Sequence, residues 1–113
     1  MYPSIRLLHQ CRITLFTRAN CSLCTNAKQT LSTVWDKRPF DYKEIDVMKP
    51  EEKKWRDLYE FDTPVIHVSL STSGEEQSEL SSQAKKLMHR FEFDQVNEKM
   101  DLVEAEASGS EEV

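Results

Sequence analysis

The fold is decided by the stretch Arg12-Ile13-Thr14-Leu15-Phe16-Thr17-Arg18-Ala19-Asn20-Cys21-Ser22-Leu23-Cys24. Its first part, residues 12–17, is short and rich in β-branched and aromatic side chains, which predicts a buried strand. A turn-like segment, residues 18–20, follows, and beyond it apolar side chains recur at the three- and four-residue spacings of one helix face. The members of this predicted face are Leu23, Ala27, Leu31 and Val34. A C-x-x-C pair therefore stands where a strand passes into a helix.

The two cysteines of this pair, Cys21 and Cys24, have the spacing and the position of a redox-active dithiol. A thiol attacks as its thiolate, and the free N–H groups and positive dipole end of a helix N-terminus stabilise that charge. Cys24 returns to the same face one turn later, where it can attack a mixed disulfide on the first sulfur. We therefore interpret Cys21 as the nucleophile and Cys24 as the resolving thiol. Arg18 either favours the thiolate and acidic substrates or is an ordinary solvated cation.

Half of a zinc site is the alternative interpretation of a C-x-x-C pair. Structural zinc takes four Cys or His ligands, often as two such pairs, and this sequence contains one pair. His9 and Cys11 precede the strand whose far end leads to Cys21, so convergence on one metal is geometrically poor. We expect no metal, and we expect Cys11 to be a small buried side chain, as free cysteines usually are.

The remaining elements complete an α/β pattern. They are strands over 40–47, 65–70 and 87–93, a helix over 50–59, a mobile loop over 71–82, and a last helix that begins at Asp94. The order is βαβαββα, which predicts a four-stranded mixed sheet flanked by helices. A helical crossover joins the first two strands in parallel, and the final hairpin supplies an antiparallel edge.

One domain is expected, over residues 12–103, between an N-terminal extension (1–11) and an acidic tail (104–113) predicted to be disordered. The extension has Arg6 and no acid, a weak feature of organellar presequences, but it is only about ten residues long. Three cysteines do not form the paired framework of a secreted scaffold, which indicates a reducing compartment. We expect the cytoplasm, with the mitochondrion as the alternative.

Composition excludes two classes of partner. The formal net charge is −5 and the basic residues do not cluster, which argues against nucleic acid because phosphate contacts need grouped Lys and Arg. No apolar run approaches the roughly 18 residues of a membrane helix, so no membrane partner is expected. We expect a monomer.

His67 and His89, placed on adjacent predicted strands, are interpreted as ordinary strand residues because no third orienting group accompanies them.

The residues from Ile13 to Cys24, together with Thr63-Pro64-Val65-Ile66-His67-Val68, resemble a glutaredoxin-like member of the thioredoxin superfamily. The resemblance covers about residues 12–103 and implies a thioredoxin fold. It implies that Pro64 is cis, faces the C-x-x-C pair and belongs to the substrate platform. The backbone of Thr63 would bind an extended thiol-bearing peptide. Asp94 would correspond to the family's acidic residue at the start of the last helix.

The resemblance implies a disulfide oxidoreductase that acts on protein disulfides or on glutathione mixed disulfides, with glutathione as a possible co-substrate and no tightly bound cofactor. The sequence departs from the family pattern at Ser22 and Leu23, where Pro and Tyr are common. It also has Arg90-Phe91-Glu92-Phe93-Asp94 where the family places a Gly-Gly turn. Two alternatives therefore stay open, an iron–sulfur protein, suggested by Ser22, and a redox sensor or adaptor without turnover.

Overall fold

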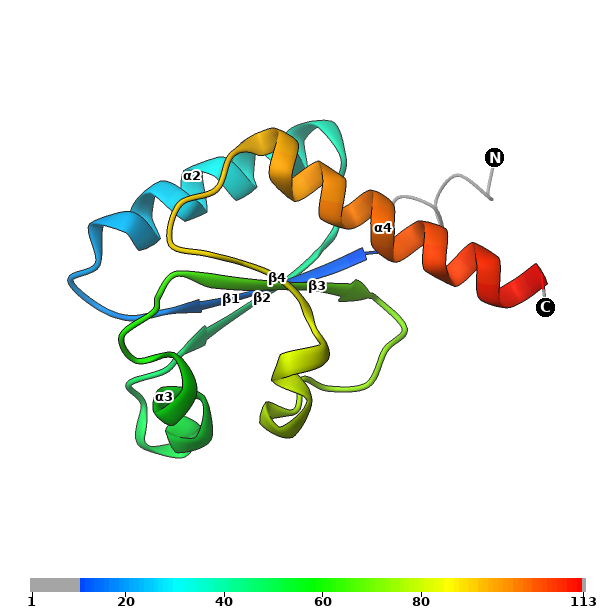
Figure 1. Cartoon of the computed structure of the whole chain (residues 1–113). Coiled ribbons are helices and arrows are strands. Elements are labelled where there is room, and N and C mark those ends of the chain that lie inside the picture. Colours follow the sequence, from blue (N-terminus) through cyan, green and yellow to red (C-terminus); the bar gives the residue numbers. More distant parts are fainter. Residues whose placement is uncertain (1–10, 113) are drawn as a thin grey trace.

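The structure, a computed structural model, describes residues 11–112. The elements are β1 (Cys11–Thr17), α2 (Ser22–Lys37), β2 (Asp41–Asp46), the short 3-10 helix η1 (Pro50–Glu52), α3 (Lys53–Tyr59), β3 (Val65–Leu70), the 3-10 helix η2 (Ser78–Gln83), β4 (Lys85–Met88) and α4 (Phe93–Glu112). The predicted order βαβαββα and the mixed sheet are confirmed (Figure 1). The N-terminal extension, with His9 and the presequence-like feature, lies outside the described residues except for Cys11.

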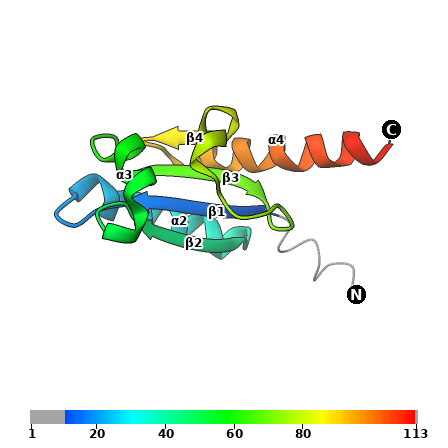
Figure 2. The same cartoon turned by 90° about the horizontal axis from the view of Figure 1, so that it is seen from below.

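The sheet has the strand order β2-β1-β3-β4, with β1 parallel to β2 and antiparallel to β3. Helices α2 and α4 cover one face, and α3 and η2 lie on the other (Figure 1). Seen from the α3 side, β1 and β3 form the middle of the sheet (Figure 2). This layering is the thioredoxin fold that the resemblance implied.

Two apolar clusters, one on each face of the sheet, hold the helices in place because successive strand side chains point to opposite faces. The cluster beneath α2 and α4 includes Ile13, Leu15, Leu31, Val34, Ile66 and Met100. The cluster beneath α3 includes Phe16, Trp55, Tyr59 and Val65. In α2 the buried members are Cys24, Ala27, Leu31 and Val34, so Cys24 takes the core position that the sequence pattern gave to Leu23. The second cysteine is thereby built into the core.

The fourth strand was predicted over 87–93, and this boundary is wrong. Strand β4 covers Lys85–Met88, and the chain then turns at His89, whose φ of 65° ends the extended conformation. The N–H of His89 donates to the Pro64 carbonyl at 2.7 Å, which closes the hairpin with β3. Phe91 is buried in the cluster beneath α2 and α4. Its apolar side chain therefore packs in the core between helices and is not part of a strand.

The acidic tail differs from the expectation of disorder. Helix α4 continues through residue 104 to Glu112 and runs on past the sheet (Figure 1). Glu104 pairs with Arg38 at 3.0 Å and Glu106 pairs with Lys85 at 3.0 Å. Two of the acidic residues that suggested a solvated tail, Glu104 and Glu106, thus find cations on neighbouring elements, and these pairs favour the helical conformation.

The long loop after β3 is attached to the sheet by a partly buried carboxylate, that of Glu76. Glu76 contacts His67 Nδ1 at 2.8 Å and Arg12 Nη2 at 3.3 Å, and His67 Nε2 shares a hydrogen bond of 2.7 Å with the Tyr59 hydroxyl. Burial would raise the pKa of Glu76, but His67 and Arg12 outweigh it and lower that pKa. His67 is a buried strand residue, as predicted, but both of its ring nitrogens have partners, Tyr59 and Glu76, that the sequence did not reveal. Among the described residues, no helix is long and apolar enough to cross a membrane.

Candidate functional site

Cys21 occupies the N-cap of α2, which places its sulfur among the free N–H groups of the first turn. Its backbone is extended (φ −123°, ψ 102°), and its Sγ accepts a hydrogen bond from the Cys24 N–H at 3.2 Å. The first turn of α2 contains no acidic residue, so the positive end of the helix dipole is not neutralised there. A thiolate on Cys21 is stabilised by both the donated hydrogen bond and the dipole.

The two cysteines form a disulfide and differ in access. Their Cα atoms are 5.2 Å apart, within the usual range for a disulfide. Cys24 is 2% exposed, whereas Cys21 is half-buried. A substrate disulfide can therefore reach the Cys21 sulfur and not the Cys24 sulfur. This difference in exposure agrees with the roles that the sequence assigned to the two thiols.

The loop before β3 borders Cys21, as the resemblance implied. The Thr63–Pro64 peptide bond is cis. The Cys21 Sγ lies 3.9 Å from the Thr63 Oγ1 and 4.0 Å from the Thr63 carbonyl oxygen. Pro64 is buried, and Phe61, two residues before Thr63, is 87% exposed. The loop therefore offers Cys21 a polar backbone edge and a neighbouring apolar side chain. Whether Thr63 and Pro64 bind a substrate stays a prediction.

Arg18 has a structural partner in this loop. Its Nη1 donates to the Glu60 carbonyl oxygen at 2.9 Å, which ties the turn before Cys21 to the end of α3. This contact does not test the predicted action of Arg18 on the thiolate or on acidic substrates, which stays a prediction. Through this hydrogen bond, Arg18 connects the segment that leads to Cys21 with the segment that leads to Thr63.

A groove of about 390 Å³ runs along α2, between this helix and the turn that follows β4, and neither cysteine lines it. Leu23, from between the two cysteines, lines one wall. His89, Arg90, Phe91 and Glu92 line the other. Asp94 is exposed in the first turn of α4 and is not among the lining residues, so its predicted contact with substrate stays a prediction.

His89 is the residue of this site that sequence reasoning misplaced. It was assigned to a strand, but it stands in the turn with a positive φ. Its Nε2 lies 3.5 Å from the Asp62 Oδ1. Asp62, which precedes Thr63 in the loop, is therefore a partner of His89 that the sequence did not reveal. One local signal could have predicted a turn at this position, because His is one of the few residues apart from glycine that are enriched at positive φ.

The comparisons with known proteins agree with this geometry. A family model described as a glutaredoxin-like domain (DUF836) matches residues 12–101. The chain belongs to this glutaredoxin-like family. Its fold is shared with thioredoxin 1 from Thermosipho africanus, at 19% identity and a TM-score of 0.57 over 87% of this chain and 98% of that one.

Two further solved structures show the same fold. The glutaredoxin-like chain matches the structural-genomics target XcR50 from X. campestris at 17% identity and a TM-score of 0.56, over 80% of this chain and 96% of the other. It matches thioredoxin-2 of the malaria parasite at 12% identity and a TM-score of 0.56, over 85% and 82% of the two chains. At these identities the likeness concerns the fold alone.

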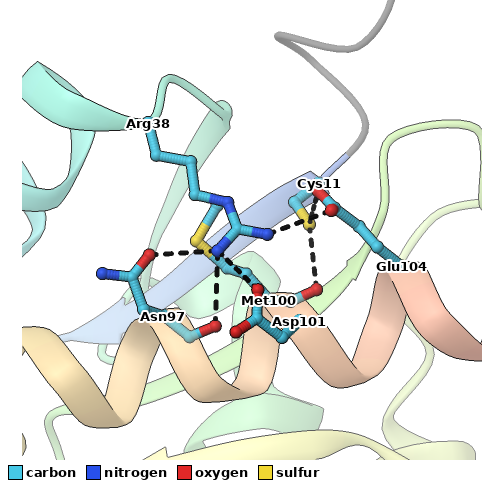
Figure 3. Close-up of polar contacts among 6 residues, drawn as sticks. All are labelled: Cys11, Arg38, Asn97, Met100, Asp101 and Glu104. Carbon is cyan, nitrogen blue, oxygen red and sulfur yellow. Dashed lines mark hydrogen bonds and ion pairs between the residues drawn. The ribbon is translucent and has the colours of Figure 1, made fainter.

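The third cysteine of this glutaredoxin-like protein lies apart from the site, at the start of β1 (Figure 3). Cys11 is 1% exposed, and its Sγ contacts the Met100 carbonyl at 3.8 Å and the Glu104 Oε2 at 3.5 Å. Burial and the Glu104 carboxylate raise the pKa of the Cys11 thiol to about 12. The prediction of a small buried side chain is confirmed. Within residues 11–112 no three His, Cys, Asp or Glu side chains gather to hold a metal.

Proposed function

We propose that this chain is a thiol–disulfide oxidoreductase that reduces disulfides in proteins or mixed disulfides of glutathione. The observation that carries the proposal is the position of Cys21 at the N-cap of α2, beside Thr63 and bonded to the buried Cys24. We expect no tightly bound cofactor, and we expect a reducing compartment, the cytoplasm or alternatively the mitochondrion.

The reaction begins when the Cys21 thiolate attacks one sulfur of the substrate disulfide. A bond forms between the two sulfurs, the substrate S–S bond breaks, and the second substrate sulfur leaves with the electron pair and takes a proton. Cys24 then loses its proton, attacks the Cys21 sulfur and expels the first substrate sulfur as a thiolate. Two electrons pass to the substrate, and the Cys21–Cys24 disulfide is the product. Glutathione or another thiol of the compartment reduces it again.

Substrate recognition is proposed to use the loop that borders Cys21. The backbone of Thr63, next to Pro64, would pair with an extended peptide on either side of the substrate cysteine. Phe61 adds exposed apolar surface on the same loop, which supports a protein substrate. Asp94, exposed at the start of α4, is the proposed partner for the amino group of glutathione if that molecule binds, and Arg18 for an acidic substrate group.

The test is reduction of a glutathione mixed disulfide, coupled to glutathione reductase, by the wild type, Cys21→Ser and Cys24→Ser. A protein disulfide such as that of insulin is assayed in parallel. We expect activity to fall to background in Cys21→Ser with both substrates, and Cys24→Ser to keep activity with the glutathione substrate alone. Full activity in Cys21→Ser would contradict the assignment of the nucleophile. A wild type that forms the disulfide reversibly without turnover would be a redox sensor.

A further inference from the structure

We propose that Tyr59, His67 and Glu76 form a buried hydrogen-bond network that positions the loop before β3, residues 60–64, against Cys21. The three are positioning residues, because they act through this loop and not on the reacting sulfurs. The inference rests on the proposed function, since it names what holds the loop that would receive a protein substrate.

The side chains of Tyr59 and His67 close the base of the loop. Tyr59 is the last residue of α3, and His67 is the third residue of β3. The Tyr59 hydroxyl and the His67 Nε2 are 2.7 Å apart, and the two residues are only 3% and 1% exposed. A directional bond thus joins the two ends of the loop in a place where water does not compete for it.

Helix α3 depends on such a bond for its exact position. It has seven residues, too few for a helix to be stable by itself, so tertiary contacts hold it. Its aromatic rings, those of Trp55 and Tyr59, lie 4.5 and 5.1 Å from the ring of Phe16. Apolar packing is non-directional and tolerates small shifts, whereas a hydrogen bond weakens steeply when its geometry changes. The bond to His67 therefore determines where the helix ends and the loop begins.

The residues that face the reactive cysteine follow Tyr59 directly. The Asp62 N–H donates to the Tyr59 carbonyl at 2.9 Å. Thr63, the next residue, has its Oγ1 at 3.9 Å from the Cys21 Sγ. A shift of Tyr59 is therefore passed along a short, internally bonded segment to Thr63, and it changes the position of that backbone relative to Cys21.

Glu76 orients the imidazole ring of His67. Its Oε1 lies 2.8 Å from the His67 Nδ1, and its Oε2 lies 3.3 Å from the Arg12 Nη2. Burial opposes the charge of Glu76, but His67 and Arg12 outweigh it and lower the pKa, so the carboxylate is ionised at neutral pH and only accepts. Nδ1 therefore carries the hydrogen of this bond, and Nε2 accepts from the Tyr59 hydroxyl.

The network thereby connects two loops on either side of β3. Glu76 belongs to the loop over 71–84, which follows the strand, whereas residues 60–64 precede it. Loss of the Glu76 contact leaves the His67 ring free to rotate, which weakens its bond to Tyr59. Binding of a protein substrate next to Cys21 is thus expected to depend on a loop attached to the opposite end of β3.

The first test measures opening of the loop without any substrate. Hydrogen exchange of the reduced full chain is followed by NMR at two amides. The His89 N–H donates to the Pro64 carbonyl and reports on the end of the loop. The Arg38 N–H donates to the Val34 carbonyl in α2 and serves as a distant reference. Local opening of the loop accelerates exchange at the first amide alone.

The variant is Tyr59→Phe, which keeps the ring and removes the hydroxyl. We expect exchange at His89 to become about tenfold faster, the factor that one buried hydrogen bond contributes, and exchange at Arg38 to change by less than about twofold. The matched control is Tyr42→Phe. It removes a hydroxyl that is also bonded at 2.7 Å, to Glu44, but on the edge strand β2, and it should leave exchange at His89 unchanged.

The second test measures substrate binding in single turnovers of the reduced full chain with excess insulin. The dependence of the rate on insulin concentration gives a half-saturating concentration and a limiting rate. We expect Tyr59→Phe to raise the half-saturating concentration by about three- to tenfold and to change the limiting rate by less than about twofold, because a loop that binds the peptide acts on binding. Reduction of bis(2-hydroxyethyl) disulfide, which is too small to span the loop, should be unaffected.

A double-mutant cycle tests whether Glu76 acts through the same bond. Glu76→Leu should raise the half-saturating insulin concentration by a smaller factor than Tyr59→Phe. The double variant should be no worse than Tyr59→Phe, because the orientation of His67 has no effect on the loop once the hydroxyl is absent.

Three results would overturn the inference. One is unchanged exchange at His89 in Tyr59→Phe, and another is equal acceleration at His89 and Arg38, which indicates a general loss of stability. The third is a double variant whose loss is the product of the two single losses, which shows that Glu76 acts independently of Tyr59. A wild type that reduces neither disulfide would instead refute the proposed function, and the exchange rates would still decide whether the network holds the loop.

Discussion

Cys11 and Cys21 lie near opposite ends of β1, and their surroundings favour an inert thiol at Cys11 and a reactive thiol at Cys21. Cys21 is half-buried at the N-cap of α2, where N–H groups and the helix dipole stabilise a thiolate. Cys11 is 1% exposed and 3.5 Å from the Glu104 carboxylate, which opposes a second negative charge. The comparison teaches that the local field and burial, and not the residue, determine the chemistry of a cysteine.

The largest expected difference is in the rate of alkylation. In the reduced native protein at pH 8, we expect iodoacetamide to modify Cys21 at least about a thousandfold faster than Cys11, because the thiolate is the nucleophile and is scarce when the pKa is about 12. Mass spectrometry of peptides from a time course measures both rates in one sample.

The control for this comparison is the same labelling in denaturant, where the two thiols should react at similar rates. Comparable labelling of Cys11 and Cys21 in the folded protein would show that Cys11 is accessible and ionised, and would remove the contrast.

The second prediction concerns stability at high pH. The folded-state pKa of Cys11 is raised from 9.0 to about 12, so its contribution is fully present below pH 9 and is lost as the pH rises toward 12. Over that window the unfolded state ionises at Cys11 and the folded state does not, which costs up to about 1.4 kcal/mol for each pH unit. The measurement is urea unfolding of reduced wild type and Cys11→Ala from pH 8 to 11.

The difference between the two proteins is the informative quantity, since all other ionisable groups are shared. The free energy of unfolding should fall more steeply with pH in the wild type than in Cys11→Ala. Parallel curves would contradict the raised pKa.

The third prediction concerns the contribution of Arg38, which lies near Cys11, to the free energy of unfolding. Arg38 joins α2 to α4 through Asn97 at 3.1 Å, Asp101 at 2.8 Å and Glu104 at 3.0 Å (Figure 3). We expect Arg38→Met to lower the free energy of unfolding by about 1–2 kcal/mol, since these charge-assisted bonds are only partly shielded from solvent. Disulfide reductase activity should not change. A loss of activity without a loss of stability would show that the two ends of β1 are coupled.

The smallest expected effect tests the substrate side of the Cys21 end. Phe61→Ser removes the exposed ring two residues before Thr63, and we expect kcat/KM for a protein disulfide to fall by about three- to tenfold through a higher KM. Reduction of a small disulfide should be unaffected, which is the matched control. An equal loss with both substrates would indicate that Phe61 supports the loop instead of contacting the substrate.

Much of the fold could be predicted because its central strands and first helix have patterns that are visible within short stretches of sequence. The run 12–17 and the run 65–70 are short, apolar and β-branched, and both became central strands. The apolar spacing after Cys21 predicted α2, although Cys24 and not Leu23 completes the buried face. The end of β4 was mispredicted because Phe91 and Phe93 look like strand residues. Only the position of α2 and α4 makes Phe91 a core residue and packs the partly buried Phe93 against the core.

The sequence by itself determined the C-x-x-C pair between a strand and a helix, and with it the local geometry from which the roles of the two thiols are proposed. The tertiary structure alone decided what surrounds that pair. It brought Thr63 within 4.0 Å of Cys21, Arg18 to the end of α3, and His89 to Asp62. These contacts join residues that are 27 to 42 positions apart in the chain. No local pattern encodes such pairs, because strand pairing and helix packing set their positions.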